Sequence, residues 1–203
     1  MTITSYTGGF TQTNGYLVET TAGNFLIDAP EGIRGWLEQN GKQVTDALLT
    51  HQHYDHVLDA AALQEAGVKL HAFAPYSEEL TLESAARAWG MPIQVEPYAI
   101  DTLFEMDRPL KLAGLEIALA HVPGHATDSV IFHLADHQLV FSGDTLFADS
   151  IGRTDLPGGS SRELLDGIAR HLLALPPDTR VLPGHGPATT IGHEKENNPF
   201  LRQ

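Results

Sequence analysis

The chain has 203 residues, 42% of them hydrophobic, and its 12 basic and 26 acidic residues give a formal charge of −14 at pH 7. A field of that sign repels phosphate backbones and anionic lipids, so we expect neither nucleic acid nor a membrane as a partner. The chain has no cysteine, which excludes disulfides, thiolate metal ligands and a cysteine nucleophile. The length favours a single domain over residues 1–203 with a full apolar core.

The first residues show no basic segment followed by an apolar segment, as a signal peptide would. No apolar run in the chain approaches the length of a membrane span. The absence of cysteine fits a reducing compartment, so the expected location is the cytoplasm.

Short apolar runs bounded by turn residues dominate the first part of the chain. Their pattern predicts, in order, strands over 16–20 and 24–30, a helix over 31–41, a strand over 44–50, a helix from His56 to Gly67, a strand over 69–73, and a helix over 75–90 that begins at its proline.

The second part reads as hairpins followed by a helix. The pattern predicts a hairpin over 109–123 turning at Ala113–Gly114, a hairpin over 129–145 turning near Asp136–His137, an amphipathic helix over 161–176 capped by Ser160 or Ser161, a strand over 180–187 and a short segment over 193–197. Strands and helices mix throughout, which predicts a layered α/β or α+β domain.

Three histidines and an aspartate crowd into the stretch THQHYDH at positions 50–56. His51 and His53 follow a predicted strand in extended chain, where residues i and i+2 project to the same side. Asp55 and His56 begin the next predicted helix, whose N-terminus favours a carboxylate. These two pairs therefore point to two neighbouring metal ions rather than to one.

Further metal-capable residues stand at three later strand ends. His125 lies in VPGHATDS, Asp144 in FSGDTLF and His185 in VLPGHGP, each next to a glycine that permits a tight turn. Each motif alone is typical of a solvated loop, but the four together predict a metal site at the rim of a sheet. The remaining histidines are expected to be hydrogen-bonded or exposed rather than ligands: His71, His121, His133, His137, His171 and His193.

The motifs THQHYDH, PGH, SGDT and PGHG, in this order, resemble those of the metallo-β-lactamase superfamily over nearly the whole chain. The resemblance implies a four-layer αββα sandwich with metals at one edge. It also implies two divalent ions, zinc first with iron or manganese as alternatives. The implied ligands are His51, His53 and His125 for one ion, Asp55, His56 and His185 for the other, and Asp144 bridging both. Asp28, in FLIDAP, matches a strand-end aspartate of the family and is expected to support the site.

Two further motifs, GRTDLPGG (152–159) and GHEKENNPFL (192–201), are similar to those of short, single-domain relatives of glyoxalase II, the hydroxyacylglutathione hydrolases. Residues 186–203 are too few for the helical domain that helps the full-length enzyme hold glutathione. The resemblance therefore supports thioester hydrolysis more than it supports any particular acyl group or thiol. Glu194 and Asn198 belong to the terminal motif and are expected to brace a loop near the site.

The resemblance predicts a metal-dependent hydrolase of small anionic thioesters such as S-acylglutathione. Two ions about 3.5–4 Å apart can activate a water molecule near neutral pH, with Asp55 and Asp144 as the catalytic, anionic ligands. Arg153 is the candidate for binding a substrate carboxylate, with an ion pair to Asp155 as the alternative. Tyr54, between the ligands, either lines the pocket or packs.

Two other functions stay open. A persulfide dioxygenase of the same superfamily would hold one iron through His51, His125 and Asp144, and the GRTD motif occurs there too. The PGHGP and NPFL sequences favour the hydrolase. A non-catalytic scaffold would use the metal for folding only, which a chain with this apolar content hardly needs. The sequence leaves the oligomeric state open.

Overall fold

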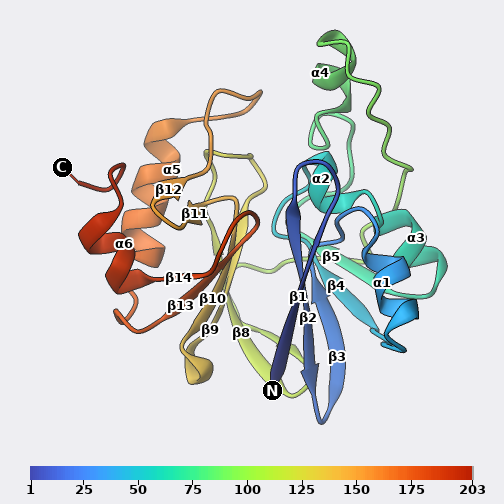
Figure 1. Ribbon diagram of the computed structural model, residues 1–203, viewed down its shortest axis with the longest axis horizontal. Helices are drawn as coiled ribbons and strands as arrows, with labels where there is room; N and C mark the ends of the chain where they lie inside the picture. Colours follow the sequence, from blue (N-terminus) through green and yellow to red (C-terminus); the bar gives the residue numbers. More distant parts are fainter. Residues whose placement is uncertain (203) are drawn as a thin grey trace. The chain divides into compact units, whose positions relative to one another are not determined.

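The computed structural model describes residues 1–202, whose helices and strands are labelled in Figure 1. The chain divides into two units, residues 1–104 and residues 105–203, and each is described by itself. Each unit holds one six-stranded sheet. The single domain over 1–203 stays a prediction.

The sheet of the first unit follows the chain, with its strands in sequence order. The strands are β1 (Thr2–Gly8), β2 (Thr13–Thr20), β3 (Gly23–Ile27), β4 (Asp46–Leu48), β5 (Lys69–Ala72) and β6 (Thr102–Leu103). The first three pair antiparallel and the pairs from β3 to β6 are parallel. The sequence predicted β2 to β5 but not β1 and β6, which are edge strands with few buried residues and so carry no apolar run.

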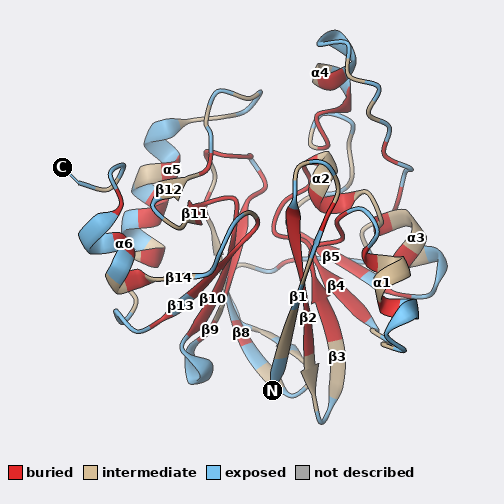
Figure 2. Cartoon of the chain, viewed as in Figure 1, coloured by how far each residue is buried: buried red, intermediate tan, exposed pale blue. Residues whose placement is uncertain are grey.

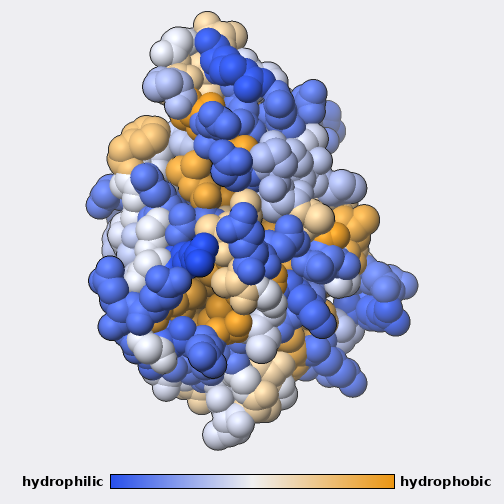
Figure 3. Space-filling model, turned by 90° about the vertical axis from the view of Figure 1, so that its right-hand side faces the viewer, coloured by the Kyte–Doolittle hydropathy of each residue, from blue (hydrophilic) through white to orange (hydrophobic). Residues whose placement is uncertain are grey.

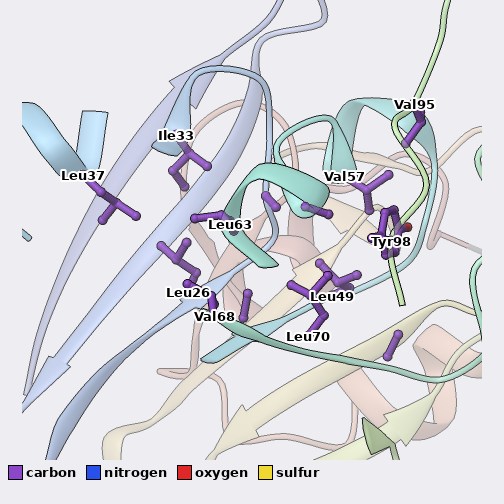
Figure 4. Close-up of a cluster of buried hydrophobic side chains, with 14 of the residues drawn as sticks. Leu26, Ile33, Leu37, Leu49, Val57, Leu63, Val68, Leu70, Val95 and Tyr98 are labelled. Atoms are coloured by element: carbon purple, nitrogen blue, oxygen red, sulfur yellow. The ribbon is translucent and has the colours of Figure 1, made fainter. Parts of the chain in front are cut away.

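Three helices pack on this sheet: α1 (Ile33–Gln39), α2 (Tyr54–Val57) and α3 (Ala60–Glu65). Their apolar side chains, among them Ile33, Val57 and Leu63, meet Leu26 and Leu70 of the strands in one buried cluster (Figure 4). The single helix predicted from His56 to Gly67 is wrong in one respect, because the chain is interrupted at Asp59. The backbone N–H of Asp59 donates to the carbonyl of Ala29, which ties the interruption to the end of β3.

The helix predicted over 75–90 is also wrong over its first half, since only α4 (Glu83–Ala88) is helical. Leu82, which precedes α4, is left-handed with φ 62°. The buried carboxylate of Glu83 accepts hydrogen bonds from the Thr81 hydroxyl at 2.8 Å and from the Val95 backbone N–H at 2.9 Å. The Thr81 bond, with backbone bonds from Thr81 to Ser77 and from Leu82 to Glu79, accompanies turns in the preceding residues, which the helical spacing of the sequence did not reveal.

The sheet of the second unit has the order β14-β13-β10-β9-β8-β7. Its strands are β7 (Leu110–Leu112), β8 (Leu115–His121), β9 (Val130–Leu134), β10 (Leu139–Gly143), β13 (Arg180–Pro183) and β14 (Thr189–Thr190). Only the β10–β13 pair is parallel among the described pairs of this sheet. Both predicted hairpins are confirmed: Ala113 and Gly114 turn with positive φ, and the second turn is η1 (Ala135–His137).

Two helices and a small ribbon complete the second unit. Helix α5 (Ser161–Gly167) continues as the π-helical turn η2 (Ile168–Leu172), and α6 (Ile191–Asn197) follows β14. Ser160 is the N-cap of α5, because its hydroxyl accepts from the Glu163 N–H. The two-stranded ribbon β11 (Leu146–Phe147) and β12 (Ser150–Ile151) was not predicted.

Burial follows the strands, and the central strands of both sheets are buried along most of their length (Figure 2). In the second unit, Val140 and Val181 of the sheet pack with Leu164, Ile168 and Ile191. On the face seen in Figure 3, hydrophilic side chains predominate and apolar patches are small and separate. None of the helices in residues 1–202 has the length and apolarity that a membrane crossing requires.

Candidate metal centre

The first set of predicted ligands gathers where β4 ends. His51 and His53 lie in the loop after β4, while Asp55 and His56 belong to α2. The ring centroids of His51 and His53 are 4.6 Å apart, and those of His51 and His56 are 4.1 Å apart. All three rings are buried. Within the first unit, the crowding seen in the sequence is therefore also a crowding in space.

Asp28 supports this set from the end of β3. Its Oδ1 accepts from the Thr50 backbone N–H at 2.7 Å. Its Oδ2 accepts from the Thr50 hydroxyl at 2.8 Å and lies 2.9 Å from Nδ1 of His56. The residue has φ 60°, a left-handed conformation that aspartate tolerates better than most residues. The supporting role predicted for Asp28 is confirmed.

Three of the predicted histidine ligands use the same ring nitrogen, Nδ1, for a hydrogen bond to the protein. The Thr50 hydroxyl donates its proton to Asp28, so its oxygen must accept from Nδ1 of His51 at 3.1 Å. Nδ1 of His56 donates to the Asp28 carboxylate, and Nδ1 of His125 donates to the Arg153 carbonyl at 2.9 Å. Each ring therefore uses Nδ1 as a donor, which leaves Nε2 as the nitrogen available to a metal ion, and metal-binding histidines are commonly held in this way.

The second set of predicted ligands lies in the second unit, at the ends of β8, β10 and β13. Oδ2 of Asp144 is 3.4 Å from Nε2 of His125 and 3.3 Å from Nε2 of His185. Two ligand atoms that each lie about 2.0–2.1 Å from one tetrahedral ion are about 3.3–3.4 Å apart. The spacing thus fits a carboxylate that shares an ion with either histidine, and the donor set suits a divalent metal.

Glycine brings the chain before His125 close to α5. A Cβ at Gly124 would meet the Leu164 nitrogen at 2.4 Å and the Ser160 carbonyl oxygen at 2.5 Å. Gly124 also has φ 125°, which other residues rarely adopt. The glycine of the PGH motif is therefore required by close packing as well as by the turn.

The GRTD motif supports two of these ligands through its backbone. A Cβ at Gly152 would lie 1.9 Å from the Asp144 carbonyl oxygen and 3.1 Å from Cβ of His125. The carbonyl of the next residue, Arg153, accepts the hydrogen bond from His125. The sequence pointed only to the Arg153 side chain. It did not predict the close packing at Gly152 or the hydrogen bond to the Arg153 carbonyl, because side-chain patterns do not describe backbone contacts.

The Arg153 side chain forms a two-pronged ion pair with Asp155, through Nε at 2.7 Å and Nη2 at 2.8 Å. Both side chains are exposed. Hydrogen bonding from the Arg153 guanidinium lowers the pKa of Asp155 to about 2. The ion pair that was the alternative interpretation does form, and a substrate carboxylate at Arg153 would have to compete with Asp155.

The terminal motif braces the β11–β12 ribbon, as predicted. The buried carboxylate of Glu194 accepts from the Asp149 N–H at 3.0 Å, the Thr189 hydroxyl at 2.5 Å and Nδ2 of Asn198 at 2.7 Å. Asn198 also donates to the Ser150 carbonyl at 3.0 Å.

A second group of residues, Asp149, His193 and Glu194, has ligand atoms close enough to hold a cation. The carboxylate of Glu194 already accepts three hydrogen bonds from the protein, so we give it a structural role.

Tyr54 packs, which is one of the two roles predicted for it, and the pocket-lining role stays a prediction. Its ring packs against the buried cluster of the first unit and also stacks on Phe10, with ring centroids 6.1 Å apart and planes inclined by 17°. Phe10 is 71% exposed in the turn between β1 and β2. Sequence reasoning missed Phe10, because a single aromatic residue in a glycine-containing turn carries no signal.

Two of the other histidines, His71 and His121, are hydrogen-bonded as expected. Nε2 of His71 lies 2.7 Å from Asp46, and Nε2 of His121 lies 2.8 Å from the Thr127 carbonyl. Burial lowers the pKa of His133 and of His171, in the latter case with a smaller contribution from Arg170.

The sequence model described as "Metallo-beta-lactamase superfamily" matches residues 8–185. The chain belongs to the metallo-β-lactamase superfamily. The fold class predicted from the motifs is confirmed, and members of this superfamily are mostly hydrolases that bind divalent metals.

The chain is similar in sequence to a named hydrolase and in structure to three solved proteins. Hydroxyacylglutathione hydrolase GloC of Haemophilus influenzae is 38% identical over 158 residues, covering 76% of this chain and 74% of that protein. The B3 metallo-β-lactamase BLEG-1 is 32% identical, with a TM-score of 0.89 and complete coverage of both chains. TTHA1623, crystallised in a di-iron-bound form, is 41% identical, with a TM-score of 0.81 over 98% of this chain and 100% of that one. ETHE1 from Myxococcus xanthus is 26% identical, with a TM-score of 0.79 over 98% and 84%.

Proposed function

We propose that the chain is a metal-dependent thioester hydrolase of the glyoxalase II-like branch, acting on S-acylglutathione or a similar small anionic thioester. The observation that carries this proposal is the Asp144 carboxylate oxygen, 3.4 Å and 3.3 Å from the Nε2 atoms of His125 and His185. Similarity to hydroxyacylglutathione hydrolase GloC supports the thioester as substrate. The −14 charge supports a small molecule, rather than nucleic acid or a membrane, as the partner.

The proposed centre holds two divalent ions. The proposed ligands are His51, His53 and His125 for one ion, Asp55, His56 and His185 for the other, and Asp144 for both. Zinc is the first expectation for this set of nitrogen and carboxylate donors. Iron is the alternative that the di-iron form of TTHA1623 supports, and manganese is the third.

Divalent ions in such a site supply an activated water near neutral pH and polarise a carbonyl oxygen. Histidine ligands bind a metal through an uncharged imidazole and would leave the positive charge of the ions undiminished, and the Nδ1 hydrogen bonds leave Nε2 of His51, His56 and His125 for that purpose. Asp55 and Asp144 add negative charge, and Asp144 is the residue proposed to orient the attacking water. A thiolate leaves without a strong acid, so no further proton donor is assigned.

The proposed substrate contacts are Tyr54 and Arg153. Tyr54 presents a ring that Phe10 extends, and this pair offers apolar area to an acyl chain. Arg153 presents a guanidinium that could exchange Asp155 for a substrate carboxylate. The cytoplasm, with its glutathione thioesters, is the proposed location.

The test combines metal content with a substrate panel. Protein purified without chelator would be analysed by plasma mass spectrometry and then assayed with S-acylglutathione, a β-lactam, and glutathione persulfide with an oxygen electrode. About two ions per chain and hydrolysis of the thioester well above that of the β-lactam are expected. Preferred β-lactam hydrolysis would overturn the thioester proposal, as would metal-independent activity.

A persulfide dioxygenase is the second candidate, and similarity to ETHE1 over 98% of the chain is the observation that favours it. It requires one iron, held by His51, His125 and Asp144. Oxygen uptake with glutathione persulfide, by protein that carries one iron per chain, would establish this function in place of hydrolysis.

A further inference from the structure

Thr13, the first residue of β2, is hydrogen-bonded to one of the proposed metal ligands. Its hydroxyl donates to Oδ2 of Asp55 at 2.7 Å, across 42 positions of the chain. Thr13 is fully buried. A hydroxyl in such a place has to be satisfied by hydrogen bonds, and a carboxylate gives a strong, charge-assisted one.

The direction of this hydrogen bond is fixed by its neighbours. The hydroxyls of Thr11 and Thr13 lie 3.0 Å apart, and either could donate to the other. A carboxylate can only accept, so the single proton of Thr13 goes to Asp55 and Thr11 must donate to Thr13. The two hydroxyls and the carboxylate therefore form a chain of hydrogen bonds that polarise one another in one direction.

The turn before β2 holds Thr13 in place. Gln12 is left-handed with φ 58°, and its side-chain amide donates to the Gly9 carbonyl at 2.8 Å. On the opposite strand, Gly8 is in register with Thr13. Thr13 thus approaches Asp55 from a fixed strand end rather than from a mobile loop.

We propose that Thr13 is a positioning residue that orients Asp55 for the second metal ion. The proposal rests on the proposed function, since it takes Asp55 as a ligand. A carboxylate oxygen has two lone pairs, so Oδ2 can accept from Thr13 and still face a cation. The same Oδ2 lies 3.7 Å from Nε2 of His56, the other ligand of that ion in this unit. The hydrogen bond from Thr13 restrains rotation of the carboxylate and so favours the orientation in which Oδ2 lies near His56.

The test is a zinc titration of metal-free protein against a chelating dye, which resolves the two dissociation constants. Thr13→Val removes the hydroxyl at nearly constant volume and is expected to weaken the second ion about 10–100-fold, leaving the first within a factor of about three. Thr13→Ser restores the donor and is expected to recover most of that affinity. Thr7→Val is the matched control, because Thr7 donates to Asn14 in the same hairpin and contacts none of the proposed ligands in the described hydrogen bonds.

The Asp55→Asn variant distinguishes the positioning role of Thr13 from the assignment of Asp55 as a metal ligand. If Asp55→Asn weakens the second ion and Thr13→Val does not, the positioning role is refuted while the metal centre stands. If wild-type protein binds only one zinc ion, or Asp55→Asn leaves both constants unchanged, the two-ion centre itself fails. Equal weakening by Thr13→Val and Thr13→Ser would show that packing, not the hydroxyl, matters at this position. Far-ultraviolet circular dichroism establishes that each variant is folded before titration.

Discussion

Asp28 and His56 form a buried pair in which the carboxylate Oδ2 lies 2.9 Å from the imidazole Nδ1. The side chains are 2% and 0% exposed, so water does not screen the pair. Because the same carboxylate binds Thr50, which in turn orients His51, one residue sets the ring orientation of two proposed ligands. The strand-end aspartate therefore orients two of the proposed ligands through hydrogen bonds.

Asp28→Asn should weaken metal binding even though it preserves the shape of the side chain. An asparagine amide group would place N–H donors where the Thr50 and His56 donors now find a carboxylate. We expect the affinity for the ion on His56 to fall about 10–100-fold, and the stability of the metal-free protein to fall by about 3 kcal/mol. Zinc titration and urea unfolding measure the two effects.

Asp46→Asn is the matched control, because Asp46 pairs with His71 at 2.7 Å in the same unit but outside the proposed ligands. It should lower stability and leave zinc affinity unchanged. If both variants change zinc affinity to the same extent, the special role of Asp28 is wrong.

Gly152→Ala should disturb the second ligand set. A Cβ at this position would lie 1.9 Å from the Asp144 carbonyl oxygen, so the backbone at Asp144 or at Gly152 must move. We expect zinc affinity and hydrolysis each to fall at least about tenfold, since a displaced ligand shell commonly costs that much. Gly35→Ala, in α1 with no atom within 4 Å of the added Cβ, should instead stabilise the protein by about 0.5–1 kcal/mol. Unchanged zinc affinity in Gly152→Ala would contradict the packing argument.

The positions of the proposed ligands were predictable because these residues stand directly after apolar strands. The sequence placed His51, His125 and His185 at strand ends, and the structure puts each of them there. The support expected from Asp28 came from the resemblance of FLIDAP to the family's strand-end motif. The short apolar runs of the sequence were enough to predict the buried strands.

What the sequence could not reveal depends on contacts between distant residues. The role of Thr13 requires knowing that β2 begins beside Asp55, 42 positions later. The Arg153 carbonyl and Gly152 act through the backbone, which side-chain patterns do not describe. The prediction of a helix failed over the first half of residues 75–90, where Thr81 donates to the buried Glu83 and Leu82 is left-handed.

The Arg153–Asp155 pair predicts an unusual carboxyl titration. Asp155 has a pKa of about 2 against an ordinary 3.8, and the largest cause is the hydrogen bond from Arg153. Because the pKa is depressed in the folded state, the pair stabilises that state fully above pH 3.8. This stabilisation is lost as the pH falls towards 2. In Arg153→Ala, the pKa of Asp155 should return close to its ordinary value. Side-chain carboxyl chemical shifts, followed by NMR against pH, measure this directly, and a wild-type value near 3.8 would show that the pair does not persist in solution.

Arg153→Ala should also separate anionic from neutral substrates. The variant removes the guanidinium but keeps the backbone carbonyl that orients His125, so the ligand geometry is preserved. Loss of a charge-assisted contact at an exposed site should raise KM for an S-acylglutathione about tenfold, with little change for a neutral thioester of the same acyl group. Arg162→Ala is the control, because Arg162 is likewise exposed and approaches an aspartate, Asp166, within its own helix. A substrate carboxylate that displaces Asp155 must also raise the pKa of Asp155 when glutathione product saturates wild-type protein. Equal KM changes for both substrates, with no change in that pKa, would leave Arg153 with a structural role alone.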